Sequence, residues 1–238
     1  MVSKNILFLF IILSGGLQAQ MFSVGGDTGP QARASDSYFR IGYSPIDFSY
    51  EGKSTAVAPE DRLDFSSPAV SFGIETQGLN ASLSFVNKLT GAEDERYLNL
   101  SLDYINRFML LKSRAFQVGI PLGLNTSLVS VQNEQISDNF SQTVFGFGLG
   151  LFTSIQIPEK ISVSFEGVPS YGVSNSSGGL FGGSNKSILA KGRLNFLNIF
   201  PGRSLSLGYD FKYSSYDLDD DEFDYGLTYH LITLGISL

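Results

Sequence analysis

Apolar and polar residues alternate along most of this chain with a period of two. The segments AVSFGIETQ (69–77) and LSLGYDFKY (205–213) alternate mainly apolar residues with small or polar ones. In an extended strand, successive side chains point to opposite faces, so this period is typical of strands with one apolar face. The chain is therefore predicted to be all-β.

About ten segments have this pattern, and eight or twelve strands are the alternatives. The predicted strands are 38–51, 66–77, 78–88, 97–108, 115–131, 142–157, 161–171, 187–199, 205–216 and 223–238. Their connections alternate in length. Long polar loops are expected at 52–65, 89–96, 132–141, 172–186 and 217–222, and tight turns lie between the other neighbours in sequence.

An even number of strands joined alternately by short turns and long loops resembles the layout of bacterial outer-membrane β-barrel proteins. The resemblance covers residues 38–238 and implies a closed antiparallel transmembrane β-barrel with periplasmic turns and extracellular loops. The last strand, ending in ITLGISL, is similar to the C-terminal assembly signal of such barrels, although Leu238 stands where an aromatic residue is usual. Outer-membrane lipid, lipopolysaccharide and the barrel assembly machinery are the implied partners.

A soluble β-sandwich or a lipocalin-like barrel would also show alternation. In a soluble barrel the apolar face points inward, and the outward face is rich in Lys and Glu. Here the polar face consists mainly of small uncharged residues, and charges gather in the loops. We therefore expect small polar groups to face a lumen and the apolar face to contact lipid.

The first residues predict export. Lys4 precedes an apolar run from Ile6 to Leu13, and Ala19 supplies a small residue before a cleavage point, so residues 1–19 are interpreted as a signal peptide. Eight apolar residues are too few to span a membrane. Residues 20–37 are expected to be a flexible periplasmic segment before the barrel (38–238). The style of the signal resembles that of exported proteins from Bacteroidota-like bacteria.

Composition excludes some functions. The chain has no Cys, which rules out thiol catalysis, thiolate metal sites and disulfides. Its formal net charge is −7, which disfavours nucleic acid as a partner. No cofactor is predicted, and the oligomeric state is left open.

The segment TVFGFGLGLFTSI (143–155) has glycine at every second position. A dinucleotide-binding fingerprint needs G-x-G-x-x-G between a strand and a helix, and no helix is expected here. The glycines are instead expected to face the lumen, together with small residues of the preceding strand. The predicted small-residue wall comprises Gly119, Gly123, Gly146, Gly148 and Gly150, and either long side chains such as Arg107 or Arg193 or a narrow passage would lie against it.

Eight charged residues fall on lumen-facing positions by the same alternation. They are Glu75, Asp103, Arg107, Glu166, Lys191, Arg193, Asp210 and Lys212. Since an unpaired buried charge is unfavourable, this balanced set predicts an ion-paired network inside the barrel, with Arg193 opposite Asp210. A polar constriction that selects small solutes is the functional alternative.

No catalytic set is visible. The single histidine, His230, has no evident nucleophile or orienting partner nearby and is interpreted as a barrel residue. The acidic run at 217–224 lacks the glycine of an EF-hand loop and is interpreted as solvated rather than as a Ca²⁺ site. The expected role is therefore structural or surface interaction. The alternatives are a narrow channel or carrier for small or apolar solutes and, third, an outer-membrane hydrolase.

Overall fold

The computed structural model describes residues 37–92, 94–113, 115–136, 139–157, 160–176, 182–218 and 224–238. These residues belong to one compact unit. The predicted signal peptide (1–19) and nearly all of the predicted segment 20–37 lie outside the described residues.

Eleven strand segments and two short 3-10 helices account for most of this unit. Their bounds are β1 (Tyr38–Tyr50), η2 (Pro59–Asp61), β2 (Phe65–Glu75), β3 (Leu79–Val86), η3 (Lys88–Thr90), β4 (Glu95–Lys112), β5 (Phe116–Asn133), β6 (Asn139–Leu149), β7 (Leu151–Ile157), β8 (Ile161–Ser176), β9 (Gly183–Phe200), β10 (Arg203–Leu218) and β11 (Tyr225–Ser237). Among the described residues, no helix is long and apolar enough to cross a membrane.

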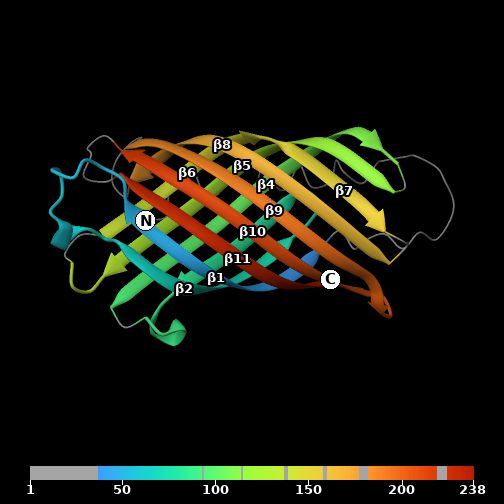
Figure 1. The fold of residues 1–238 in the computed structure, drawn as a ribbon, viewed down its shortest axis with the longest axis horizontal. Coiled ribbons are helices and arrows are strands. Elements are labelled where there is room, and N and C mark those ends of the chain that lie inside the picture. The colour runs from blue at the N-terminus through green and yellow to red at the C-terminus, as the bar shows by residue number, and fades with distance from the viewer. Residues whose placement is uncertain are drawn as a thin grey trace, which may run out of the picture. The chain divides into compact units, whose positions relative to one another are not determined.

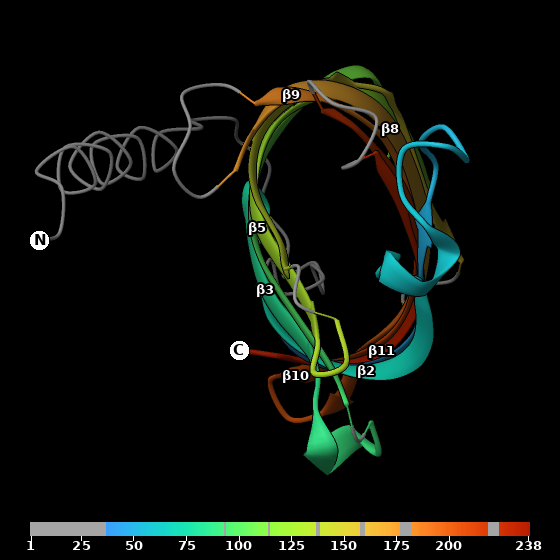
Figure 2. The same ribbon diagram turned by 90° about the vertical axis from the view of Figure 1, so that its left-hand side faces the viewer.

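The strands form one closed antiparallel barrel. Each pairs with its neighbours in sequence, except that β6 and β7 do not pair with each other but both pair with β5 and β8. β1 pairs with β11 from Tyr38 opposite Ser237 to Tyr50 opposite Tyr225. Closure leaves no strand edge exposed to lipid. The strands are tilted, so those of the near and far walls cross in side view (Figure 1), and the end view shows the closed ring of strands (Figure 2).

β6 and β7 are two parts of a single barrel strand, so the barrel has the predicted ten strands. Both segments pair with β5 on one side and β8 on the other, and the register with each neighbour is the same on both sides of Gly150. The break falls opposite Pro121, which has no N–H to donate to the ladder, although the Gly150 N–H still donates to the Pro121 carbonyl at 3.1 Å.

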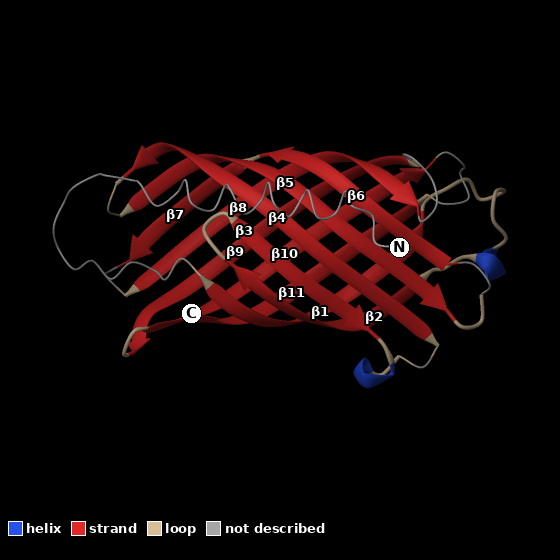
Figure 3. Cartoon of the chain, turned by 180° about the vertical axis from the view of Figure 1, so that it is seen from behind, coloured by secondary structure: helices blue, strands red, loops and turns tan. Residues whose placement is uncertain are grey.

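Long connections gather at one end of the barrel and short turns at the other, as predicted. The connection that contains η2 and the one that contains η3 lie at the same end (Figure 3), and the β9–β10 turn lies at the end where the chain terminates (Figure 1). We call these the loop end and the turn end.

The predicted loop 172–186 is wrong in extent. β8 continues to Ser176 and β9 begins at Gly183, with Tyr171 opposite Lys186 and Ser174 opposite Gly183. Gly, Ser and Asn suggest a loop, but ladder pairing with the neighbouring strands holds these residues extended despite their low strand propensity.

The outer face of the barrel is apolar over its middle. Outward side chains such as Ile41, Phe147 and Leu234 are each about half exposed, at 49%, 54% and 57%. Inward positions of the same strands hold small or charged residues, including Gly42, Gly148 and Arg40. This is the arrangement of a barrel that spans a membrane, and the fold predicted from the alternation is confirmed.

Candidate functional site: the interior of the barrel

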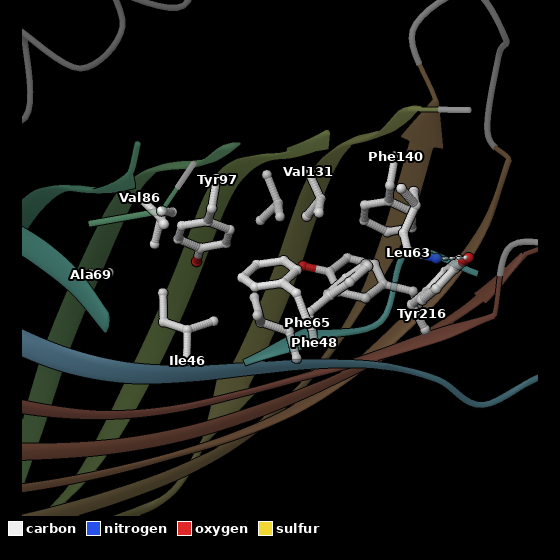
Figure 4. Packing of buried hydrophobic residues seen from close by; sticks show 14 of the residues in the cluster. Ile46, Phe48, Leu63, Phe65, Ala69, Val86, Tyr97, Val131, Phe140 and Tyr216 are labelled. Carbon is white, nitrogen blue, oxygen red and sulfur yellow. Dashed lines mark hydrogen bonds between the residues drawn. The ribbon is translucent and has the colours of Figure 1, made fainter. Parts of the chain in front are cut away.

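Apolar side chains fill the interior at the loop end. We call this cluster the loop-end core, and it comprises Ile46, Phe48, Leu63, Phe65, Ala69, Val86, Ala92, Tyr97, Val129, Val131, Phe140, Val144, Tyr216, Leu218, Tyr225 and Leu227 (Figure 4). Most of its members occupy inward positions near the loop-side ends of β1–β6, β10 and β11. The expectation that small polar groups face the whole lumen is therefore wrong for this end.

Aromatic rings from opposite walls meet in the loop-end core. β1 and β6 are five strands apart in either direction round the barrel. Even so, the rings of Phe48 on β1 and Phe140 on β6 are only 5.1 Å apart in an edge-to-face arrangement. Tyr225 on β11 stacks on Phe48 at 4.7 Å and contacts Phe140 at 5.3 Å. Phe48 is 0% exposed and Phe140 is 1% exposed, so these rings fill the centre of the lumen at this level.

Two of the long loops contribute side chains to this core. Leu63 follows η2 and is 4% exposed, and its N–H donates to the Tyr225 hydroxyl at 3.4 Å. Ala92, in the connection before β4, is also buried. Arg62 donates to the carbonyls of Ser54 and Val57, both at 3.2 Å, and so folds the β1–β2 loop on itself. The loops are therefore anchored to the interior.

A layer of ion pairs crosses the lumen nearer the turn end. Arg193 on β9 donates to both carboxylate oxygens of Asp210 on β10, with Nη2–Oδ2 at 3.0 Å. Its Nε also donates to Glu75 Oε2 at 3.1 Å, and Glu75 lies on β2, four strands away. Asp210 is directly opposite Lys191 in the ladder, so Arg193 reaches it diagonally. Bidentate pairing of this kind is stronger and more directional than a single ionic contact.

Arg40 belongs to the same layer and was missing from the predicted set. It lies on β1, and its Nε is 2.5 Å from Glu75 Oε2. Its Nη1 donates to the Ser206 hydroxyl at 3.2 Å. The signal was present in YFRIGY (38–43), where Phe39, Ile41 and Tyr43 define the outward face and place Arg40 inside.

A second ion pair spans three strands. Arg107 on β4 donates through Nε to Glu166 Oε2 on β8 at 2.6 Å. Its Nη1 donates to the Gln77 carbonyl at 3.1 Å, and its guanidinium lies 4.9 Å from the centre of the Phe152 ring. We call Arg40, Glu75, Arg107, Glu166, Arg193 and Asp210 the ion-pair layer.

The remaining predicted charges line an interior cavity of about 90 Å³. Lys191 on β9, Lys212 on β10 and Asp103 on β4 all border it and are half-buried. Within the described part of the chain, none of the three has an ion-pair partner within 4.0 Å or a side-chain hydrogen bond. The eight predicted residues therefore separate into a paired group and an unpaired group.

Short side chains from neighbouring strands occupy the space over two glycines of the small-residue wall. A Cβ built on Gly146 would overlap the Asn125 side chain, and one on Gly148 would overlap Ser170 and Val168. Of the five predicted wall residues, Gly123 alone borders the interior cavity.

Of the two long arginines expected against this wall, Arg107 lies beside its turn-end part, over the ladder partner of Gly119, and Arg193 lies elsewhere. Arg193 lies against Gly208, and Arg107 lies over Phe152. Gly119 faces Met109 near the turn end. Gly150 lies so close to β8 that an added Cβ would overlap the Gly167 carbonyl.

His230 points outward from β11 and is exposed. Its Nδ1 and the Tyr209 hydroxyl are 2.7 Å apart, and its ring is 5.2 Å from that of Phe211. Tyr209 and Phe211 are outward residues of β10, so His230 is part of an aromatic group on the outer surface and does not face the lumen.

Most of the acidic run at 217–224 lies outside the described residues, which include Asp217, Leu218 and Asp224. The Leu218 N–H donates to Asp224 Oδ1 at 2.8 Å and so closes the loop-end hairpin. Among the described residues, no group of three or more His, Asp or Glu side chains is arranged to hold a metal ion.

A family model with the description "Protein of unknown function (DUF3996)" matches residues 66–196, from the start of β2 through most of β9. No curated protein sequence matches this chain. The Bacteroidota-like source suggested by the signal peptide stays a prediction.

Several solved structures are similar to the barrel. The outer membrane protease OmpT from Escherichia coli matches with a TM-score of 0.39 and 10% identity over 85% of this chain and 96% of OmpT. The translocator domain of the autotransporter NalP from Neisseria meningitidis matches with a TM-score of 0.33 and 11% identity over 98% of this chain and 97% of that domain. The attachment invasion locus protein Ail of Yersinia pestis matches with a TM-score of 0.29 and 13% identity over 86% of this chain and 97% of Ail.

Proposed function

This chain belongs to the DUF3996 family, and we propose that it is a closed outer-membrane barrel that acts through its extracellular loops, without an open channel or a catalytic centre. The observation that carries the proposal is the contact between Phe48 and Phe140 across the full width of the lumen. Around eight to ten strands, a barrel interior is narrow enough to be filled by side chains, and here the loop-end core fills it. The ion-pair layer gives a second obstruction nearer the turn end.

Surface interaction is the role that this arrangement supports best. The loop end is organised rather than open, because Leu63 and Ala92 tie two loops to the interior. Because their buried side chains pack in the filled lumen, these loops are held in one arrangement. A loop that is already ordered loses less conformational entropy when it binds a partner outside the cell. Outer-membrane lipid and lipopolysaccharide would surround the apolar outer face, and the assembly machinery would engage β11.

Planar-bilayer recording of the purified, folded protein tests the absence of a channel. We expect no stable conductance steps in the wild type across a range of salt concentrations, whereas a bacterial porin in the same bilayers gives them. Reproducible steps from the wild type would contradict the proposal. They would favour the second candidate, a narrow path for small solutes, which the interior cavity supports.

Trypsin treatment of intact cells tests the orientation. We expect cleavage after Lys53, which is exposed in the β1–β2 loop, and no cleavage after Lys112 or Lys160 at the turn end. Mass spectrometry of the released peptides identifies the site. The opposite pattern would place the long loops in the periplasm and contradict a surface role.

N-terminal sequencing of the mature protein would test export, with Gln20 expected as the first residue.

A further inference from the structure

We propose that the interior cavity binds inorganic phosphate as its monoanion, dihydrogen phosphate. Its oxygens accept hydrogen bonds from the ammonium groups of Lys191 and Lys212, and its O–H donates to the Asp103 carboxylate. The inference goes beyond the proposed surface role, because it assigns a ligand to the part of the lumen that the loop-end core leaves empty. It rests on the charges that face the cavity, on their lack of partners, and on the size of the space.

The charges that border the cavity are not balanced. Four basic residues and three acidic residues line it: Arg40, Lys191, Arg193 and Lys212 against Glu75, Asp103 and Asp210. The two arginines pair with Glu75 and Asp210. Two lysines and one carboxylate then remain, and even a complete pairing of Asp103 would leave one ammonium group without a counter-charge. Since an unpaired charge in a protein interior is unfavourable, an anion bound in the cavity would supply the missing counter-charge.

The two lysines are positioned to share one ligand. Asp210 is directly opposite Lys191 in the β9–β10 ladder, and Lys212 is two residues further along β10 on the same inward face. The lysines are thus diagonal neighbours, whose side chains start about 7 Å apart and are long enough to converge on a single ion.

Uncharged donors and acceptors complete the site. Ser170 and Ser187 are paired across β8 and β9, and both border the cavity. On the other side are Asp103 and its ladder partner Asn80, whose buried Oδ1 has no hydrogen-bond partner. A ligand with both oxygen acceptors and an O–H donor can accept hydrogen bonds from the lysines and serines and donate one to Asp103 or Asn80. Dihydrogen phosphate has both, is present near neutral pH, and carries the single negative charge that the cavity lacks, whereas sulfate and chloride have no proton to donate.

The cavity, of about 90 Å³, has room for a small ion such as inorganic phosphate.

Phosphorus-31 NMR and calorimetric titration of the folded barrel in detergent test the proposal, with inorganic phosphate as the probe and sulfate at equal ionic strength as the comparison. We expect saturable binding of one phosphate per barrel, and at least a tenfold loss of affinity in Lys191→Met and in Lys212→Met. Lys186→Met is the matched control, because Lys186 lies on the outward face of β9 and should leave binding unchanged. Asp103→Asn should reduce the preference for phosphate over sulfate.

Heat-modifiable mobility in SDS gels verifies that each variant is folded before titration. The proposal is overturned if the wild type shows no saturable binding, if sulfate binds as tightly as phosphate, or if Lys186→Met weakens binding as much as the inward variants do. Failure here leaves the closed-barrel proposal intact, since a silent bilayer recording does not depend on the cavity being occupied. Conductance, conversely, would contradict the closed barrel whether or not phosphate binds.

Discussion

At the scale of single residues, Arg193 links three elements of the interior. Its guanidinium donates to Asp210 on the neighbouring strand and to Glu75 across the lumen, and Glu75 is also held by Arg40. Each member of this cluster compensates the desolvation of another, so the loss of one partner leaves an uncompensated buried charge.

Arg193→Met should destabilise the barrel by about 3–5 kcal/mol, because Asp210 loses its bidentate partner and Glu75 loses one of its two arginines. Arg193→Lys should recover only part of the loss, since an ammonium group cannot pair with the two carboxylate oxygens in the bidentate geometry of Arg193. Urea unfolding followed by tyrosine fluorescence measures both. An unchanged midpoint for Arg193→Met would show that the contacts of Arg193 with Asp210 and Glu75 contribute nothing to stability.

A glycine pair offers a cleaner steric comparison. Gly150, between β6 and β7, lies beside Gly167 on β8. An added Cβ at Gly150 overlaps the Gly167 carbonyl, whereas one at Gly167 meets nothing within 4 Å. Gly150→Ala should therefore cost about 1–3 kcal/mol through overpacking, while Gly167→Ala should be neutral or slightly stabilising. Equal unfolding midpoints for the two variants would contradict the close approach of these strands.

At the scale of elements, each strand meets two different environments. On β11, Leu234 is 57% exposed towards lipid, while the adjacent Thr233 is 4% exposed and faces the lumen. The type of residue at the inward positions also differs between the two ends of a strand. On β1, the inward positions pass from Arg40 near the turn end to Ile46 and Phe48 near the loop end. One strand thus contributes to the ion-pair layer and to the loop-end core.

Single cysteines test this alternation, and the absence of native cysteine makes the labelling specific. A bimane probe attached at Leu234→Cys should be quenched strongly by brominated lipid, and one at Thr233→Cys only weakly, because side chains one residue apart face opposite sides of the wall. Similar quenching at both positions would contradict the assigned faces of β11.

At the scale of the whole molecule, the barrel combines a membrane exterior with a partly apolar interior. Phe48 lies in the middle of the apolar part of the interior, where its ring contacts those of Phe65, Phe140 and Tyr225. Its removal leaves a void that the closed wall cannot easily collapse to fill.

Phe48→Ala should lower the free energy of unfolding by about 3–5 kcal/mol, and Phe48→Leu by less than about 1.5 kcal/mol. Comparing their urea midpoints with the wild type measures the difference. Equal effects of the two substitutions would argue that the ring is not tightly packed.

Much of this architecture followed from the sequence, and the reasons for the exceptions are physical. Period-two alternation is a local property, so the strand number and the closed barrel were predictable. The extent of β8 and β9 was not, because pairing partners override the low strand propensity of residues such as Ser174 and Gly183. Inward positions follow from parity, and the alternation of YFRIGY (38–43) places Arg40 among them.

The loop-end core was harder to foresee from local patterns. Its members are single apolar residues on the otherwise polar face of many strands, such as Val86, Val129 and Val144. Only the barrel topology brings them to one level, and no single segment contains enough of them to stand out. Pairings such as Arg193 with Glu75 depend on the diameter of the barrel, which the sequence of either strand does not specify.

The loop-end core also has a calorimetric consequence. A barrel with a water-filled lumen exposes little new apolar interior when it unfolds, whereas unfolding this one transfers a cluster of buried aromatic and aliphatic side chains into water. Hydration of apolar surface raises heat capacity by roughly 0.45 cal/K/mol per Å², so the unfolding transition should carry a heat-capacity increment closer to that of a soluble domain. The stability of this barrel should accordingly pass through a maximum with temperature and decline again on cooling.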